Sequence, residues 1–177
     1  MLSRELKSNK LQGVGQKRII LAAAIALFIV VAAAATFSYL TGGCLILSNG
    51  KTGEEYARFN LREGGTFSVG FIHSVNKSPV TDFYQITDGR IYVEKTIYYG
   101  FGAGVQTEIE EGQTLEYGED GSMIVSGFHK EIPDLLYIVG TVSDHVLVIN
   151  GGREISLRDL CGRSSLVRFT YERAHLF

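Results

Sequence analysis

An uncharged apolar run near the N-terminus limits most strongly what this chain can fold into. From Ile19 to Leu40 the sequence contains no charged residue, and its few polar side chains lie in the last turn or two. A helix rises about 1.5 Å per residue, so a run of this length spans the ~30 Å hydrocarbon core of a membrane. The run predicts a transmembrane helix over residues 19–40.

The charges on either side of this run predict its orientation. Only Glu5 opposes the basic residues before the run, and no charge follows it until Lys51; the basic residues are Arg4, Lys7, Lys10, Lys17 and Arg18. Positive residues stay on the cytoplasmic side of a membrane. We therefore expect residues 1–18 to be a cytoplasmic tail of a single-pass cell-membrane protein. The C-terminal domain would lie outside, on the periplasmic or extracellular face.

A cleaved signal peptide is the alternative interpretation of the same run. The alanines of residues 32–35 offer small side chains of the kind that precede a cleavage site. Apolar regions of signal peptides usually extend over only ~7–15 residues, however. The length of the run favours an uncleaved signal anchor.

Alternating residues after Leu40 predict a β-rich domain over residues 44–177. Residues 66–73 place every second side chain on one face, which is typical of a strand. Asp88-Gly89 between two further alternating segments indicates a hairpin turn. Similar signals recur every 8–12 residues, and a short helical turn is expected near residues 157–162. The fold class is thus all-β, a small sandwich or barrel-like domain of about nine to ten short strands.

Composition limits the partners of this domain. The 17 basic and 19 acidic residues give a net charge of -2. Binding to phosphate backbones requires clustered positive charge, so nucleic acid is not an expected partner.

Two cysteines bracket nearly the whole outer domain. Cys44 and Cys161 could pair as a disulfide on an oxidising face of the membrane. Two separate thiols, or a lipid-modified Cys44 after small residues, are the alternatives.

One group of residues has the chemistry of nucleophilic catalysis. His73, Ser74 and Asp82 supply an imidazole, a hydroxyl and a carboxylate, which is the set used by serine hydrolases. Adjacent residues on a strand point to opposite faces, which separates Ser74 from His73. We therefore expect His73 and Asp82 to be structural, as hydrogen-bonded partners, and the protein not to be an enzyme.

Metal and cofactor sites are not expected. The four histidines lie far apart, without the short ligand spacings of a zinc site. The glycines of residues 100–104 follow a strand but open no convincing helix, so they do not form a dinucleotide-binding fingerprint.

The same region resembles a known family. The segment 71–75 reads Phe-Ile-His-Ser-Val, a Pro-Val pair and an acidic residue follow, and a Gly-Ala-Gly turn comes later. This order is similar to the signature of DUF1850, a bacterial and archaeal domain family of unknown function. The motif positions, a candidate functional surface, are His73, Ser74, Val75, Pro79, Asp82, Gly102, Ala103 and Gly104. The chain departs from the pattern at Asp82, where the family usually has Glu, and near Val105-Gln106, where a Pro is common.

The resemblance implies a setting for the protein. Members of this family resemble small membrane-anchored companions of TAXI-type TRAP transporters, which take up organic anions with a separate binding protein. We therefore expect an accessory protein that contacts a TRAP permease or its solute-binding receptor through residues 100–105 and 77–82. The alternative is an extracytoplasmic ligand-binding module or a hydrolase that uses His73, Ser74 and Asp82.

Overall fold

The computed structural model of the chain describes residues 20–37, 42–75, 77–99 and 109–173. The chain divides into two compact units, one that contains an N-terminal helix and one that runs from Thr41 to His175. The helix, Ile20–Phe37, has 18 residues with a mean hydropathy of 2.7 and is long and apolar enough to cross a membrane. The predicted apolar helix is therefore present, and its length and composition fit a membrane anchor and a signal sequence alike.

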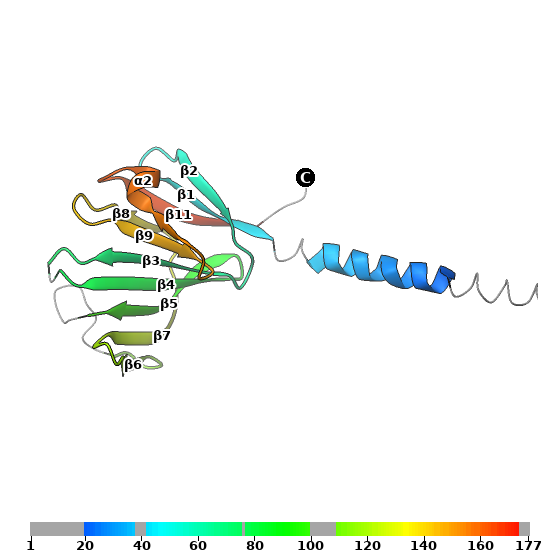
Figure 1. Ribbon diagram of the computed structural model, residues 1–177, viewed down its shortest axis with the longest axis horizontal. Coiled ribbons are helices and arrows are strands. Elements are labelled where there is room, and N and C mark those ends of the chain that lie inside the picture. The colour runs from blue at the N-terminus through cyan, green and yellow to red at the C-terminus, as the bar shows by residue number, and fades with distance from the viewer. Residues whose placement is uncertain (1–19, 38–41, 76, 100–108, 174–177) are drawn as a thin grey trace, which may run out of the picture. The chain divides into compact units, whose positions relative to one another are not determined.

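The second unit is built almost entirely from strands, which Figure 1 labels in chain order. Eleven strands and one short helix lie within its described residues: β1 Gly43–Asn49, β2 Glu55–Asn60, β3 Thr66–Ile72, β4 Pro79–Thr87, β5 Arg90–Tyr98, β6 Thr114–Tyr117, β7 Met123–Glu131, β8 Leu135–Ile138, β9 His145–Ile149, β10 Glu154–Ser156, α2 Leu157–Cys161 and β11 Leu166–Arg173.

The strands form two antiparallel sheets. One has the order β2-β1-β11-β8, and the other has the order β10-β9-β3-β4-β5-β7-β6. Figure 1 shows them as two layers. The predicted all-β sandwich with an N-terminal apolar helix is confirmed, and the described part of the chain has eleven strands where the sequence indicated nine to ten.

Local sequence signals account for several of the connections. Asp88 and Gly89 both have positive φ angles, as the turn of the β4–β5 hairpin requires. Ser156 caps α2, because its hydroxyl accepts a hydrogen bond from the backbone N–H of Asp159 at 3.0 Å. Both features were predicted from the sequence, and the short helix begins one residue after its cap.

The core lies between the two sheets. Register places Phe67 and Val69 of β3 on the same face as Tyr84 and Leu147 of the neighbouring strands β4 and β9. These side chains are buried against residues of the other sheet, including Phe169, whose ring stacks on Phe67 at 5.8 Å. Alternating apolar residues on both sheets therefore produce a shared core. A second, smaller buried cluster lies on the larger sheet and consists of Val80, Tyr98, Met123 and Val125.

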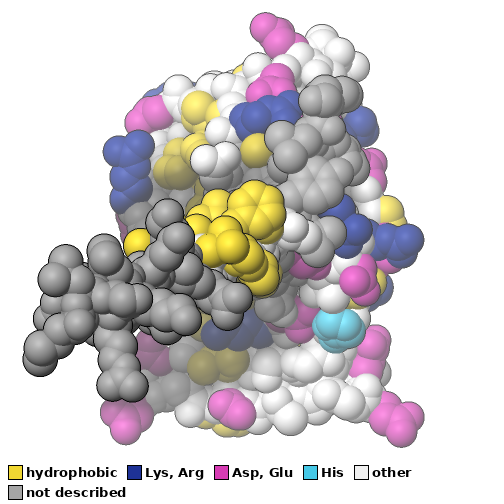
Figure 2. Space-filling view, turned by 90° about the vertical axis from the view of Figure 1, so that its right-hand side faces the viewer, with side chains coloured by type: hydrophobic (Ala, Val, Ile, Leu, Met, Phe, Trp, Pro, Cys, Tyr) yellow, Lys and Arg dark blue, Asp and Glu magenta, His cyan; other side chains and the backbone are white. Residues whose placement is uncertain are grey.

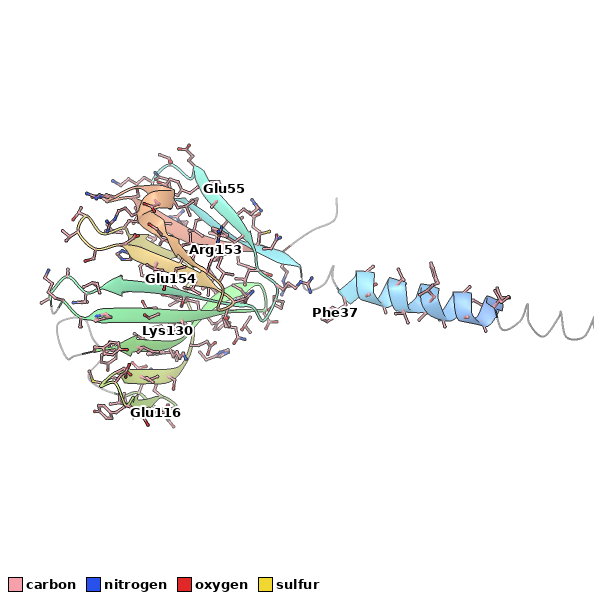
Figure 3. The ribbon with its side chains drawn as sticks, viewed as in Figure 1. Phe37, Glu55, Glu116, Lys130, Arg153 and Glu154 are labelled. Atoms are coloured by element: carbon pink, nitrogen blue, oxygen red, sulfur yellow. The ribbon has the colours of Figure 1, made fainter. Side chains whose placement is uncertain are left out.

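The sheet edges carry charge. Glu55 lies on β2, Glu116 on β6 and Glu154 on β10, which are three of the four edge strands, and Figure 3 labels all three residues. Charged residues on an edge discourage pairing with another chain. On the face seen in Figure 2, acidic and basic side chains are interspersed, so this face has no extended field of one sign.

Candidate functional site

The motif residues that follow β3 form a tight turn. The backbone N–H of His73 donates to the carbonyl of Ser78 at 2.9 Å, and the N–H of Lys77 donates to the carbonyl of His73 at 3.0 Å. Within the turn, Nδ1 of His73 accepts the N–H of Val75 at 3.3 Å. The proton of a neutral His73 imidazole is therefore on Nε2, on the far side of the ring.

A second segment, the β8–β9 loop of residues 139–144, faces this turn. Nδ1 of His145 accepts the N–H of Gly140 at 3.2 Å, and the His145 ring stacks on Phe71 with centroids 5.1 Å apart. Burial lowers the pKa of His145, although the Asp144 carboxylate opposes the shift. His145 is thus neutral near pH 7, again with its proton on Nε2.

The short helix α2 fixes the β8–β9 loop. A side-chain N–H of Arg158 donates to the carbonyl of Val142 at 3.1 Å. Asp144 accepts hydrogen bonds from the Ser156 hydroxyl and, at 3.0 Å, from the backbone N–H of Arg158. Although burial raises the pKa of Asp144, these hydrogen bonds hold it below its usual value. The loop is therefore fixed by hydrogen bonds to Ser156, at the end of β10, and to Arg158, at the start of α2.

Between the turn and the loop lies an open cavity of about 660 Å³, which we call the motif cavity. Its described lining combines one cation, two imidazoles, hydroxyl groups and apolar side chains, with no acidic residue: Phe71, Ile72, His73, Ser74, Lys77, Ile138, Gly140, Thr141, Val142, Ser143 and His145. Sites for small molecules are commonly of this size, about 300–1,000 Å³, with a few polar groups on an apolar wall.

Asp82 does not lie in this cavity and does not contact His73. One oxygen of its carboxyl group accepts the Thr96 hydroxyl at 2.8 Å, and the other accepts the Tyr137 hydroxyl at 2.7 Å. The predicted hydrogen bond between His73 and Asp82 is therefore wrong. The reason is register: Asp82 pairs with Val69 on the inner face of the sheet, whereas His73 lies beyond the end of β3.

Tyr137 connects the Asp82 carboxyl group to the other sheet of the sandwich. It comes from β8 in the smaller sheet, and its hydroxyl lies 2.6 Å from that of Tyr84. Tyr137 donates its only proton to Asp82, so Tyr84 donates to Tyr137. Burial, and next the charge of Asp82, raise the pKa values of Tyr84 and Tyr137 far above the usual tyrosine value. Four residues, Thr96, Asp82, Tyr137 and Tyr84, thus form one hydrogen-bonded chain that links the sheets.

The hydrolase arrangement is not assembled from the predicted residues. Both carboxyl oxygens of Asp82 are occupied by hydroxyl groups, so Asp82 does not orient an imidazole. Nδ1 of His73 is occupied by a backbone N–H. Ser74 is exposed at the cavity, and no hydrogen bond to its hydroxyl from His73 or Asp82 is formed.

Of the remaining motif positions, the structure describes Val75 and Pro79. Val75 is 65% exposed at the tip of the turn, and Pro79 begins β4 opposite Ile72. Gly102, Ala103 and Gly104 lie outside the described residues, so the predicted contact at residues 100–105 stays a prediction. In the other predicted contact segment, residues 77–82, the Asp82 side chain is not available to a partner. Its carboxyl group accepts hydrogen bonds from Thr96 and Tyr137 between the two sheets.

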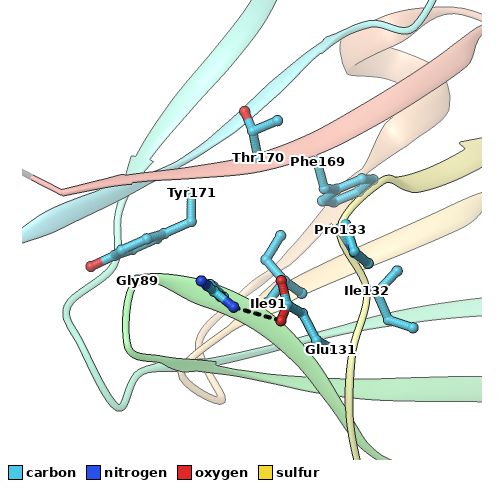
Figure 4. A pocket seen from close by; sticks show the side chains of 9 residues that line it. Gly89, Ile91, Glu131, Ile132, Pro133, Phe169, Thr170 and Tyr171 are labelled. Atoms are coloured by element: carbon cyan, nitrogen blue, oxygen red, sulfur yellow. Dashed lines mark hydrogen bonds and ion pairs between the residues drawn. The ribbon is translucent and has the colours of Figure 1, made fainter.

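A smaller cavity of about 220 Å³ lies elsewhere, between β5 and β11. Figure 4 shows Phe169, Thr170 and Tyr171 on one side of it and Gly89 and Ile91 on the other. Its charged groups, Arg90 and Glu131, pair with each other at 2.9 Å. The two charged side chains that line this cavity are therefore already paired with each other.

The two cysteines are free thiols in the structure, so the disulfide that the sequence allowed is not formed. Cys44 is half-exposed at the start of β1, and its sulfur lies 3.7 Å from the side-chain oxygen of Asn60. Cys161 points into the core from α2, and burial raises its pKa to about 11.

We expect Cys161 to react much more slowly than Cys44 with a maleimide at pH 8. Raising a thiol pKa from 9.0 to about 11 lowers the thiolate fraction roughly 100-fold, and thiolate is the reactive form. Single Cys44→Ser and Cys161→Ser variants, each with one thiol left, give the two rates by mass spectrometry. Equal rates, or a disulfide in the native protein that only a reductant opens, would contradict this assignment.

Among the residues that the structure describes, no three His, Cys, Asp or Glu side chains gather into a group that could hold a metal ion. The motif cavity, in contrast, has side chains that could hold a small ligand.

Sequence reasoning missed two residues of this region, His145 and Tyr137. A signal for His145 existed, because it alternates with Leu147 and Ile149 and so shares the inward face of β9. Tyr137 lay within a predicted strand, but no local pattern reveals that its hydroxyl reaches a carboxyl group of the opposite sheet.

Comparison with known proteins gives one match. A family model described as a domain of unknown function, DUF1850, matches residues 67–157. Neither a curated protein nor a solved structure matches the chain. The matched segment contains β8 and nearly all of the larger sheet, together with both walls of the motif cavity, whereas β1, β2 and β11 lie outside it.

Proposed function

The chain belongs to the DUF1850 family of domains of unknown function, and from this premise we propose that it is a membrane-anchored accessory protein of a transporter. In this proposal, the β domain lies outside the cytoplasm and contacts the permease or the solute-binding receptor of a TAXI-type TRAP transporter for organic anions. The family resemblance suggests the transporter as the partner, and exposed apolar side chains of the β domain support one surface for the contact.

The observation that carries the proposal is an exposed apolar rim at the motif end of the domain. We define the motif rim as Val75, Ile138 and Val142, which are 65%, 66% and 88% exposed. Ile138 and Val142 line the motif cavity, and Val75 lies in the turn opposite them. Apolar side chains gathered at one place on a surface commonly mark an interaction site.

The apolar N-terminal helix supports a partner in the same membrane. The apolar helix Ile20–Phe37 has the length of a membrane span. Confining two proteins to one membrane raises their effective concentration, so a small contact such as the motif rim is sufficient for association.

Co-purification tests the proposal. The full-length chain, extracted with a mild detergent from cells that express the transporter, is expected to recover the permease or its receptor. Val142→Asp places a charge in the motif rim and is expected to reduce this recovery at least about tenfold, because a desolvated unpaired charge costs more than about 1.4 kcal/mol.

Tyr117→Asp provides the matched control. Tyr117 is 68% exposed on β6, outside the motif rim, so its replacement adds the same charge and leaves recovery unchanged. If the native chain recovers no transporter component, and a deletion strain takes up solute normally, the proposed association is wrong.

A further inference from the structure

We propose that the motif cavity is a binding site for a small organic monocarboxylate with a compact apolar body. This inference goes beyond the transporter association, because it concerns a ligand of the isolated chain and requires no partner protein.

The positive character of the site comes from Lys77. Its side chain lines the motif cavity, and within the described residues it forms no ion pair. The described lining contains no carboxylate, and the nearby Asp144 is occupied by Ser156 and by backbone N–H groups. Among the described residues, the lining itself therefore offers an anion one cation and no carboxylate, and Asp144, behind His145, is hydrogen-bonded away from the cavity lining.

The two histidines add hydrogen-bond donors. Nδ1 of His73 and Nδ1 of His145 both accept a backbone N–H from their own loops. This leaves the Nε2–H of each ring as a donor, and both rings line the cavity. Two imidazole donors with one ammonium group suit the two oxygens of a carboxylate.

The walls of the cavity are held in place before a ligand binds. On one side, the 73–78 turn is closed by the backbone hydrogen bonds of His73. On the other, Arg158 and Asp144 fix the β8–β9 loop, and His145 is stacked on Phe71. Binding to fixed donors costs little ordering of side chains and loops.

The apolar part of the lining selects the rest of the ligand. Phe71 and Ile72 line the same cavity as the three donors. A single ammonium group balances one negative charge, whereas a phosphate dianion would keep an uncompensated charge beside these apolar side chains. The chemistry therefore points to a monocarboxylate with an apolar body, and benzoate is a suitable probe.

Calorimetric titration of the full-length chain in detergent micelles tests this inference, with empty micelles as the blank. We expect saturable binding of benzoate, and binding of benzamide at least about tenfold weaker, because the amide has the same shape without the charge. Lys77→Gln should weaken benzoate binding by a similar factor. Lys51→Gln, a lysine in the β1–β2 turn outside the cavity, should leave it unchanged.

A second variant tests the imidazole donor. His145→Phe retains a ring beside Phe71 and removes both nitrogen atoms, so benzoate binding should fall at least about tenfold. Because the part-buried Gly140 N–H loses its acceptor, the thermal midpoint should also fall by several degrees, and binding is measured well below that midpoint. Lys77→Gln keeps the test valid if the phenylalanine variant does not fold.

Three results would overturn the assignment: no saturable heat with benzoate, equal affinities for benzoate and benzamide, or unchanged affinity in Lys77→Gln. Tighter binding of inorganic phosphate than of benzoate would reject the ligand class. None of these results depends on the transporter. If the native chain binds benzoate but does not co-purify with a transporter component, only the proposed transporter association is rejected.

Discussion

Replacing Asp82 by alanine is expected to lower the thermal midpoint of the β domain by about 10 °C. The carboxyl group of Asp82 accepts hydrogen bonds from Thr96 and Tyr137, which come from different sheets. Its removal leaves two hydroxyl groups without their acceptor, at ~1–3 kcal/mol each. A loss of about 3 kcal/mol corresponds to a shift of this size in a domain of about 130 residues. Thermal unfolding followed by circular dichroism measures it.

Two controls separate this effect from the general cost of a substitution. Asp134→Ala removes a carboxylate whose ion pair with Arg168 lies on the surface, and it should cost less than about 1 kcal/mol. His73→Ala should also have a small effect, because the Val75 N–H that it leaves lies in an exposed turn. An Asp82→Ala variant that melts with the native protein would show that the hydrogen-bonded chain does not stabilise the sandwich.

The two tyrosines of the same hydrogen-bonded chain should lower the free energy of unfolding at alkaline pH. The pKa values of Tyr84 and Tyr137 are raised in the folded protein, chiefly by burial. Unfolded tyrosines ionise near about pH 10. Below that pH both states keep the phenol protons, and above it only the unfolded state releases them, so stability falls as pH rises. Each such tyrosine contributes a slope of up to about 1.4 kcal/mol per pH unit, and Tyr137→Phe should make the decline less steep.

The second large effect concerns the membrane. We expect the full-length chain to remain in the membrane after an alkaline carbonate wash, and a reporter fused after Phe177 to be active outside the cytoplasm. We expect the uncharged run that contains the helix Ile20–Phe37 to act as the anchor, and the preceding basic residues to set the orientation. Deleting residues 20–37 should release the protein from the membrane completely.

A matched variant tests the orientation separately from the anchoring. Replacing the five basic residues before the helix with glutamine should reduce the fraction of reporter outside while leaving the chain in the membrane. Recovery of a shorter, soluble form of the native chain would instead identify residues 19–40 as a cleaved signal.

Local patterns in the sequence were sufficient for the elements of the fold. The uncharged run predicted the helix, period-two alternation predicted the strands, and Asp88-Gly89 and Ser156 predicted a turn and a helix cap. These features depend on residues close together in the chain, because backbone conformation and the burial of one face are set locally. The sequence also placed His73 and Ser74 among the candidate residues, and both line the motif cavity.

Partners distant in the chain were decided only by the tertiary structure. Asp82 contacts Tyr137 because two sheets pack face to face, and His145 faces the His73 turn because β9 pairs with β3. The sequence suggested instead that Asp82 would bond to His73 and that Cys44 and Cys161 could join. A carboxyl group bonds to whichever donor the register of the sheet places opposite it, and that register is set by the burial of apolar residues throughout the domain.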